Sequence, residues 1–438
     1  MLMGRKVYLA GLFIISMFFA GCQPKVYLMP SPAGIVPGGE LFNLSPDNKD
    51  DNLLYTLYAT NRQPIESSNR SDHYSIFPSE TLRMGFVVHR VGEGSMSWDE
   101  IYNESLQAKR NKDILVTREY AREVVDYNIE DDLKTVSSQA DGFFEQIDEL
   151  LDENIDKDIL LYVHGANSSY YRATAQGAQF YHFTGHNSVV ITFSWPSAEN
   201  ILKYKVDVMH AKQTVPAFAR LIELLATHTK AKHINILAYS AGAQVTAPGL
   251  VYLREAYPDM TTDELKKKFR IGEVYFASPD AEFKSFAHRF SIFKDIVGRT
   301  TINMNLDDRV LEFSAFENGF SRLGRPDLTE VSPEDLQILI DASNTPQLDL
   351  LDVAGSAALN IGHAHDSWYN HPWVSTDVLM LLLFNADPLE RGLEPYKYED
   401  GSTGYRFPED YDRRIKELIA GNKKELLEKL QAEGRDET

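Results

Sequence analysis

Between residues 157 and 308, short apolar runs alternate with helical patterns, and this alternation constrains the fold more than any other feature. Five runs are expected as strands: "KDILLYVHGAN" (157–167), "NSVVITFSWP" (187–196), "HINILAYS" (233–240), "IGEVYFASPD" (271–280) and "RTTINMNLDD" (299–308). The first is almost continuously apolar, which is typical of a strand buried on both faces. Helical stretches between strands imply right-handed crossovers and a mainly parallel sheet. We therefore expect an α/β fold with helices flanking the sheet.

The chain has 438 residues, 43% of them hydrophobic, which is enough for a large core. Its formal net charge of −20 argues against nucleic acid as a partner. The α/β domain is expected over residues 52–385, and the polar, charged residues 386–438 as a C-terminal extension. Residues 312–347 lack clean periodicity and are expected to form a cap, with Phe313, Phe316 and Phe320 available to line an acyl pocket. A packed structural insertion is the alternative.

The N-terminus resembles a bacterial lipoprotein signal peptide over residues 1–21. A charged start is followed by an apolar run from Val7 to Ala20 that is short for a membrane span. Cys22, the only cysteine, follows in "FAGC", which resembles a lipobox whose cysteine is acylated. We expect a lipid anchor at Cys22 and a tether over residues 22–51, which are rich in Pro, Gly, Asn and Asp.

The residue after the anchor is Gln23, not the aspartate that favours inner-membrane retention in Gram-negative lipoproteins. By that resemblance, the expected location is the cell envelope, at the outer membrane facing the periplasm. With its only thiol lipidated, the protein can form no disulfide.

Ser240 stands where a strand is expected to become a helix, inside "AYSAG" (238–242). This is an A-x-S-x-G form of the nucleophile elbow, a sharp turn that projects the serine hydroxyl above the sheet. Small residues two before and two after the serine allow the close approach that this turn needs. A serine that merely caps a helix is the alternative. Placement inside a series of strand–helix–strand units favours a nucleophile, because ligands bind beyond the carboxyl ends of parallel strands.

A second loop, His164-Gly165-Ala166-Asn167, follows the first buried strand. In the elbow architecture an oxyanion hole takes one backbone N–H from such a loop and one from the residue after the serine. Those donors are expected to be Ala166 and Ala241. We interpret His164 as a structural residue that braces the loop.

Three aspartates beyond the elbow fit the chain order Ser…Asp…His: Asp280 ends one strand, and Asp307 and Asp308 end the next. We favour Asp308, because the acid of this architecture usually follows the later strand. Asp280 is the second choice; its alternative role is to cap a following helix.

The base is expected in "NIGHAHDSWYNHP" (360–372), with His365 as first choice, His363 as second and His371 also present. Two histidines at i and i+2 could also begin a zinc site. Serine and tryptophan follow at positions 367 and 368, however, and a catalytic zinc needs three protein ligands. We expect no metal and no cofactor.

Several motifs in a fixed order make the chain similar to a bacterial branch of α/β hydrolases catalogued as a domain of unknown function. They are "YATNR" (58–62), "VHGAN" (163–167), "FSWPS" (193–197), "DRVL" (308–311) and "HDSWYNHPWVSTD" (365–377). The resemblance covers roughly residues 53–385. It implies an α/β-hydrolase fold, with Ser240 as nucleophile, Asp308 as acid and His365 as base. The chain departs from the pattern at Ala238 and at Asp366.

These features predict an envelope-tethered serine hydrolase that cleaves small-molecule carboxylic esters. The alternative is a non-catalytic binding protein that has kept the fold, since fold alone does not imply activity.

Overall fold

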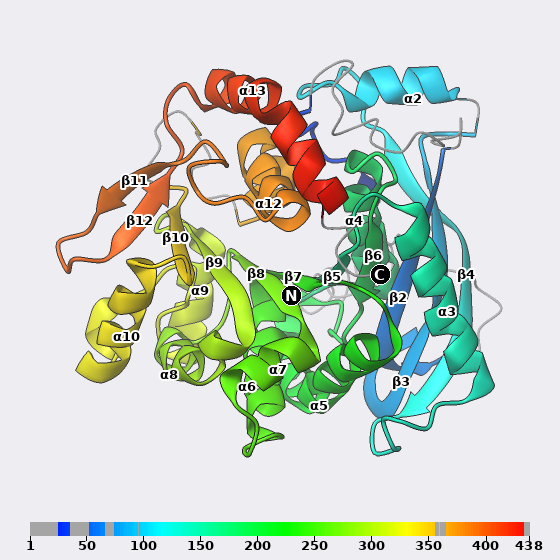
Figure 1. The fold of residues 1–438 in the computed structure, drawn as a ribbon, viewed down its shortest axis with the longest axis horizontal. Helices are drawn as coiled ribbons and strands as arrows, with labels where there is room; N and C mark the ends of the chain where they lie inside the picture. Colours follow the sequence, from blue (N-terminus) through cyan, green and yellow to red (C-terminus); the bar gives the residue numbers. More distant parts are fainter. Residues whose placement is uncertain are drawn as a thin grey trace, which may run out of the picture.

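The structure, a computed structural model, describes residues 25–35, 52–65, 74–94, 96–354, 359 and 365–432. Within these residues twelve strands form one sheet in the order β1-β4-β3-β2-β6-β5-β7-β8-β9-β10-β12-β11 (Figure 1). The strands are β1 (Val26–Tyr27), β2 (Leu53–Pro64), β3 (Tyr74–Val91), β4 (Leu115–Asn128), β5 (Ile159–Val163), β6 (Val189–Phe193), β7 (Ile234–Tyr239), β8 (Ile271–Ala277), β9 (Val297–Met304), β10 (Leu348–Asp352), β11 (Glu394–Lys397) and β12 (Thr403–Arg406).

The middle of the sheet is parallel from β2 through β6, β5, β7, β8, β9 and β10 to β12. Antiparallel strands β3, β4 and β1 lie beyond β2 on one side of the sheet, and β11 lies antiparallel beyond β12 on the other. The expected mainly parallel α/β sheet is therefore confirmed. All carboxyl ends of the parallel strands lie along one edge, which we call the carboxyl edge, and ligands bind at such an edge in folds of this kind.

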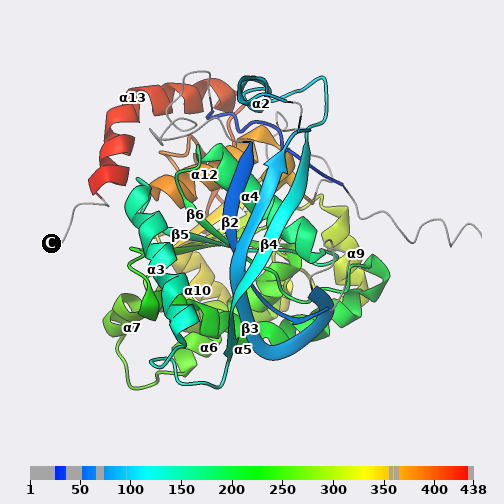
Figure 2. The same ribbon diagram turned by 90° about the vertical axis from the view of Figure 1, so that its right-hand side faces the viewer.

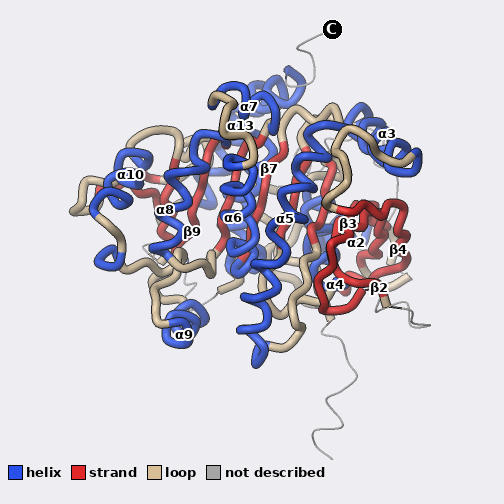
Figure 3. The backbone as a smooth tube through the Cα atoms, turned by 90° about the horizontal axis from the view of Figure 1, so that it is seen from below, coloured by secondary structure: helices blue, strands red, loops and turns tan. Residues whose placement is uncertain are grey.

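Helices cover both faces of the sheet. They are α2 (Trp98–Ser105), α3 (Ser138–Glu153), α4 (Tyr170–Phe183), α5 (Tyr204–His228), α6 (Ala243–Glu255), α7 (Thr262–Phe269), α8 (Phe283–Phe293), α9 (Arg309–Asn318), α10 (Pro333–Ser343), α11 (Ser367–Asn370), α12 (Pro372–Phe384) and α13 (Tyr411–Ala432). In Figure 1, α12 and α13 lie above the sheet, and Figure 3 shows α5, α6 and α8 covering it from below.

Each face of the sheet carries its own apolar core. In β5, Ile159, Leu161 and Val163 join the core under α3, α5, α6 and α8. Leu160 and Tyr162 join the core under α4 and α12. Successive strand residues point to opposite faces, so a strand covered on both sides is apolar throughout. This explains the near-continuous apolar run of the first expected strand.

Residues 25–35 pack on the domain, although the sequence suggested a tether over 22–51. Val26 pairs with Val116 of β4, and the backbone N–H of Gly34 donates to the Thr376 hydroxyl at 3.0 Å. Leu28, Met29, Ala33 and Ile35 are buried. Burying these apolar side chains against the domain is favourable in free energy, and a solvated linker would leave them exposed to water. The expected signal peptide, Cys22 and the remaining tether residues lie outside the described residues. No helix in the described part of the chain has the length and apolar character needed to cross a bilayer.

Part of the expected C-terminal extension also belongs to the fold. β11 and β12 continue the sheet beyond β10, and Phe407, Tyr411 and Ile415 are buried. The reason lies in α12, where every side chain from Val374 to Phe384 is buried. Because this helix is apolar all round, its face away from the sheet must also pack against other residues. α13 packs there and supplies it.

The segment expected as a cap, residues 312–347, contains most of α9, a 3-10 turn η4 (Leu328–Glu330) and α10. α10 packs on α8 and β10, with Leu339 and Ala342 in the core. α9 lies at the carboxyl edge and exposes its aromatic side chains.

Candidate active site

Ser240 occupies a sharp turn between β7 and α6. Its φ is +50°, the left-handed region that strains a residue with a side chain, and its side chain is buried. A Cβ on Gly242 would stand 2.6 Å from the carbonyl oxygen of Val163. A Cβ on Gly165 would stand 3.0 Å from that of Ser240. The turn is thus pressed against the end of β5, which is why small residues surround the serine.

The structure brings Ser240, His365 and Asp308 into one hydrogen-bonded chain. His365 Nε2 lies 2.7 Å from Ser240 Oγ, and His365 Nδ1 lies 2.7 Å from Asp308 Oδ2. With the Nδ1 proton directed at the carboxylate, Nε2 is left to accept the serine proton. The three residues come from the ends of β7 and β9 and from the segment before α11.

Asp308 is held by the helix that follows it. Its Oδ1 accepts hydrogen bonds from the backbone N–H groups of Val310 and Leu311, at 2.8 and 3.0 Å, and so caps α9. The carboxylate is fully buried. One oxygen is therefore committed to the helix and the other to the imidazole, which fixes the plane of the carboxylate.

The second-choice acid, Asp280, lies in a different cluster. Its carboxylate accepts from the hydroxyls of Tyr204 and Ser314, at 2.6 and 2.7 Å, and pairs with Arg322 at 2.5 Å. These contacts tie α5, α9 and the loop after β8 together. Asp280 thereby secures α9, the helix that Asp308 caps.

The other sequence candidates take structural positions or cannot be placed. Asp307 is exposed beside Asp308. His371 caps α12 by accepting from the backbone N–H of Trp373 at 3.2 Å. His363 lies outside the described residues. No three His, Cys, Asp or Glu side chains among the described residues are placed to hold a metal ion.

The His164–Asn167 loop lies directly against the serine turn. Of the two expected oxyanion donors, Ala241 directly follows Ser240 in the turn. The other is the backbone N–H of Ala166, from which no described group accepts a hydrogen bond. His164 is fully buried and stacks on Trp195, with ring centroids 5.2 Å apart. Burial lowers the pKa of His164 to about 3, so the ring is neutral and braces the loop.

Arg62, for which the sequence indicated no role, stabilises the residues that follow this loop. Its buried guanidinium donates to the carbonyl oxygen of Ser168 at 2.8 Å and pairs with Glu199 at 3.3 Å. Burial lowers its pKa to about 10, so it stays charged at neutral pH. Asp207 accepts from the backbone N–H groups of Asn167 and Ala198. The segments "YATNR", "VHGAN" and "FSWPS" therefore lie together around the His164–Asn167 loop. The occurrence of all three motifs in one sequence was the feature that could have predicted this arrangement.

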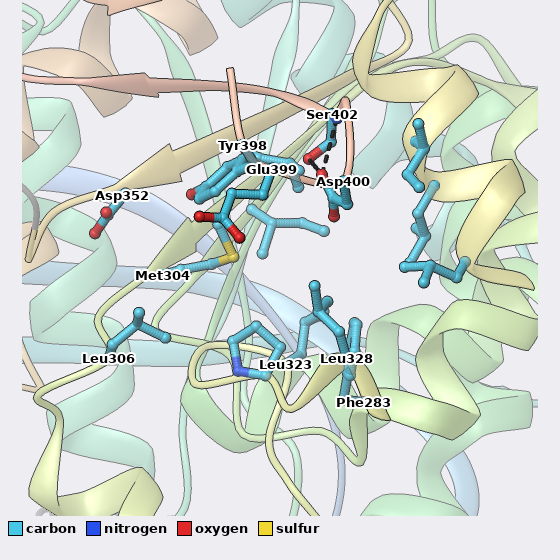
Figure 4. A pocket seen from close by; sticks show the side chains of 16 residues that line it. Phe283, Met304, Leu306, Leu323, Leu328, Asp352, Tyr398, Glu399, Asp400 and Ser402 are labelled. Carbon is cyan, nitrogen blue, oxygen red and sulfur yellow. Dashed lines mark hydrogen bonds between the residues drawn. The ribbon is translucent and has the colours of Figure 1, made fainter. Parts of the chain in front are cut away.

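A largely apolar cavity of about 490 Å³ lies against one face of β9 and β10, between α10 and the turn of the β11–β12 hairpin (Figure 4). Met304 and Leu350 line it from the sheet, and Leu306, two residues before Asp308, lies at its border. Its polar lining comprises Asp352 at the end of β10 and Tyr398, Glu399, Asp400 and Ser402 in the hairpin turn.

Comparison with protein families matches residues 139–379 to alpha/beta hydrolases of unknown function (DUF900). A search of curated proteins and a search of solved structures found no match. The matched segment runs from α3 through Ser240 and Asp308 to α12 and spans more than half of the chain. The chain therefore belongs to this family of alpha/beta hydrolases of unknown function.

Proposed function

We propose that the protein is a serine hydrolase that cleaves carboxylic esters, with Ser240 as nucleophile, His365 as general base and Asp308 as acid. One observation carries the proposal: the unbroken chain of two 2.7 Å contacts from Ser240 Oγ through the His365 ring to Asp308. The left-handed backbone of Ser240 supports it, because strain of this kind at a buried polar residue gathers at functional sites.

In the proposed reaction, His365 Nε2 takes the proton of Ser240 as Oγ attacks the acyl carbonyl carbon. The buried carboxylate of Asp308 holds the neutral His365 ring in its Nδ1–H tautomer and stabilises the imidazolium that forms. The backbone N–H groups of Ala166 and Ala241 donate to the oxyanion, each contributing roughly 2.7–4 kcal/mol. His365 then protonates the departing alcohol. Water, deprotonated by the same nitrogen, attacks the acyl-serine and releases the acid.

We also propose that the chain is held at the cell envelope by a lipid on Cys22, at the outer membrane facing the periplasm. The charged start, the apolar run and the position of the only cysteine support this. Cys22→Ser should abolish labelling by a radioactive fatty acid and release or misprocess the protein. Unchanged processing and membrane retention of that variant would contradict the anchor.

Labelling with a fluorophosphonate probe tests the activation of Ser240. Wild type should be labelled and should hydrolyse a short-chain ester, whereas Ser240→Ala should do neither and keep its circular dichroism spectrum. His365→Ala should lose nearly as much activity, since such residues act as a unit. A wild-type protein that takes up no probe and turns over no ester would be a non-catalytic binding protein with this fold. Full turnover by Ser240→Ala would contradict the mechanism.

A further inference from the structure

An exposed apolar surface surrounds α9 at the carboxyl edge. Its members and their exposed fractions are Leu306 50%, Val310 43%, Phe313 60%, Phe316 82%, Phe320 49% and Leu328 43%. We call these six residues the α9 patch. Of the four exposed phenylalanines in the described residues, three belong to it. Apolar side chains exposed in such a group mark an interaction surface rather than an ordinary protein surface.

The patch is fixed to the candidate active site. It begins two residues before Asp308 and continues along the helix that Asp308 caps. Ser314, on the same helix, donates to Asp280, and Leu311 is buried beneath it. Whatever contacts the patch therefore lies close to Asp308.

The first described residues enter the domain on the same side. Val26 pairs with Val116, whose carbonyl oxygen accepts from the hydroxyl of Tyr171 at 2.5 Å. Tyr171 lies in the first turn of α4, immediately after the loop that faces Ser240. Figure 2 shows the dark blue segment 25–35 reaching toward the right of the molecule, the side on which α9 lies. In that view the start of the packed chain and α9 therefore lie on the same side of the molecule.

The chain between the proposed anchor and this packed segment is short. Only Gln23 and Pro24 separate Cys22 from Lys25. Three residue steps span at most about 11 Å, so a lipid on Cys22 holds Lys25 close to the bilayer surface.

We propose that the α9 patch docks on the lipid bilayer in which Cys22 is anchored and presents the active site to acyl lipids of that bilayer. The inference rests on the proposed anchor and hydrolase activity. Leu306 and Leu328 also border the 490 Å³ cavity, so the apolar surface continues inward from the patch.

The residues of the patch favour apolar contact with the bilayer, and charge attraction contributes little. The chain carries a net charge of −20, and the charges on α9 are mixed, with Arg309 against Glu312 and Glu317. Anionic lipids therefore offer no advantage, and docking should occur on zwitterionic lipids with weak dependence on salt. Burying one phenylalanine side chain in the interface strengthens partitioning about tenfold or more.

Spin labelling of the full-length lipidated protein tests the docking. Because Cys22 is the only cysteine, its lipidation leaves an introduced cysteine as the sole thiol. Phe316→Cys places the label in the patch. Tyr252→Cys is the matched control: it is 48% exposed and lies near the end of α6, which runs away from the carboxyl edge. Both are reconstituted in phosphatidylcholine vesicles and exposed to oxygen and to a water-soluble nickel chelate.

The label at position 316 should collide with oxygen and be protected from nickel about tenfold relative to the label at position 252. Equal nickel access at the two positions would overturn the proposal. Protection from both reagents together with spin–spin broadening would show that a second copy covers the patch, which would also overturn it.

Turnover gives a second readout. Phe316→Ser should lower the ratio of turnover on vesicle-borne long-chain ester to turnover on soluble short-chain ester about tenfold, while Tyr252→Ser keeps the wild-type ratio. An unchanged ratio for Phe316→Ser would contradict presentation of bilayer lipids. Absence of turnover on both esters in wild type would instead contradict the proposed hydrolase, and the collision data would still test docking.

Discussion

Asp308→Asn should remove about four orders of magnitude of ester turnover while leaving the fold intact. Oδ1 of Asp308 accepts two backbone hydrogen bonds at the start of α9, at 2.8 and 3.0 Å. An asparagine can accept both with its amide oxygen, and it caps helices as well as aspartate does. The amide nitrogen must then occupy the position of Oδ2, 2.7 Å from His365 Nδ1.

That nitrogen is a donor, so Nδ1 of His365 must accept. The ring proton moves to Nε2, which then cannot take the proton of Ser240. Rotating the amide would set its NH₂ against two backbone donors in a fully buried position, at a cost of roughly 1–3 kcal/mol for each group left unsatisfied. The wrong tautomer is therefore retained, and a loss of about 10⁴ in kcat corresponds to about 5.4 kcal/mol.

The assay is kcat/KM for a short-chain ester, with unfolding by denaturant measured alongside. Asp308→Ala is the matched control, since it removes the cap and should lower the free energy of unfolding by roughly 1 kcal/mol, which Asp308→Asn should not. Turnover by Asp308→Asn above a tenth of wild type would refute the tautomer reasoning. If Asp280→Asn were inactive at the same time, Asp280 would be the acid.

Three further predictions concern the scaffold. Gly242→Ala should lower ester turnover at least about tenfold and stability by roughly 1–3 kcal/mol, because its Cβ would meet the Val163 carbonyl oxygen at 2.6 Å; wild-type kinetics would exclude that close approach. Burial raises the pKa of Glu273 to about 7, so wild type should lose stability as pH rises from 4.5 to 7, by at most about 3 kcal/mol. Glu273→Gln should remove this loss, and equal pH slopes in denaturant titrations would contradict it. Arg62→Lys should cost roughly 1–3 kcal/mol of stability and slow turnover, since an ammonium lacks the planar fork that reaches both Ser168 and Glu199; unchanged unfolding and kcat would show that the loop does not need it.

Features governed by local sterics could be read from the sequence. Alternation of apolar runs with helical patterns predicted the parallel sheet, because the side-chain period of a strand depends only on its own backbone. The small residues around Ser240 predicted a tight turn for the same reason: a Cβ at position 242 has no room wherever such a turn is made. The order of the serine, the aspartates and the histidines followed from the chain itself.

Choices between equivalent residues depended on contacts across the fold. Asp280 and Asp308 both follow strands, yet the Asp308 carboxylate meets His365 at 2.7 Å and the Asp280 carboxylate pairs with Arg322. His365 lies 125 positions from Ser240, and no local pattern determines such a meeting. The packing of residues 25–35 and the exposure of α9 have the same origin. Each depends on which surfaces other segments leave uncovered, and that is set only when the whole chain has folded.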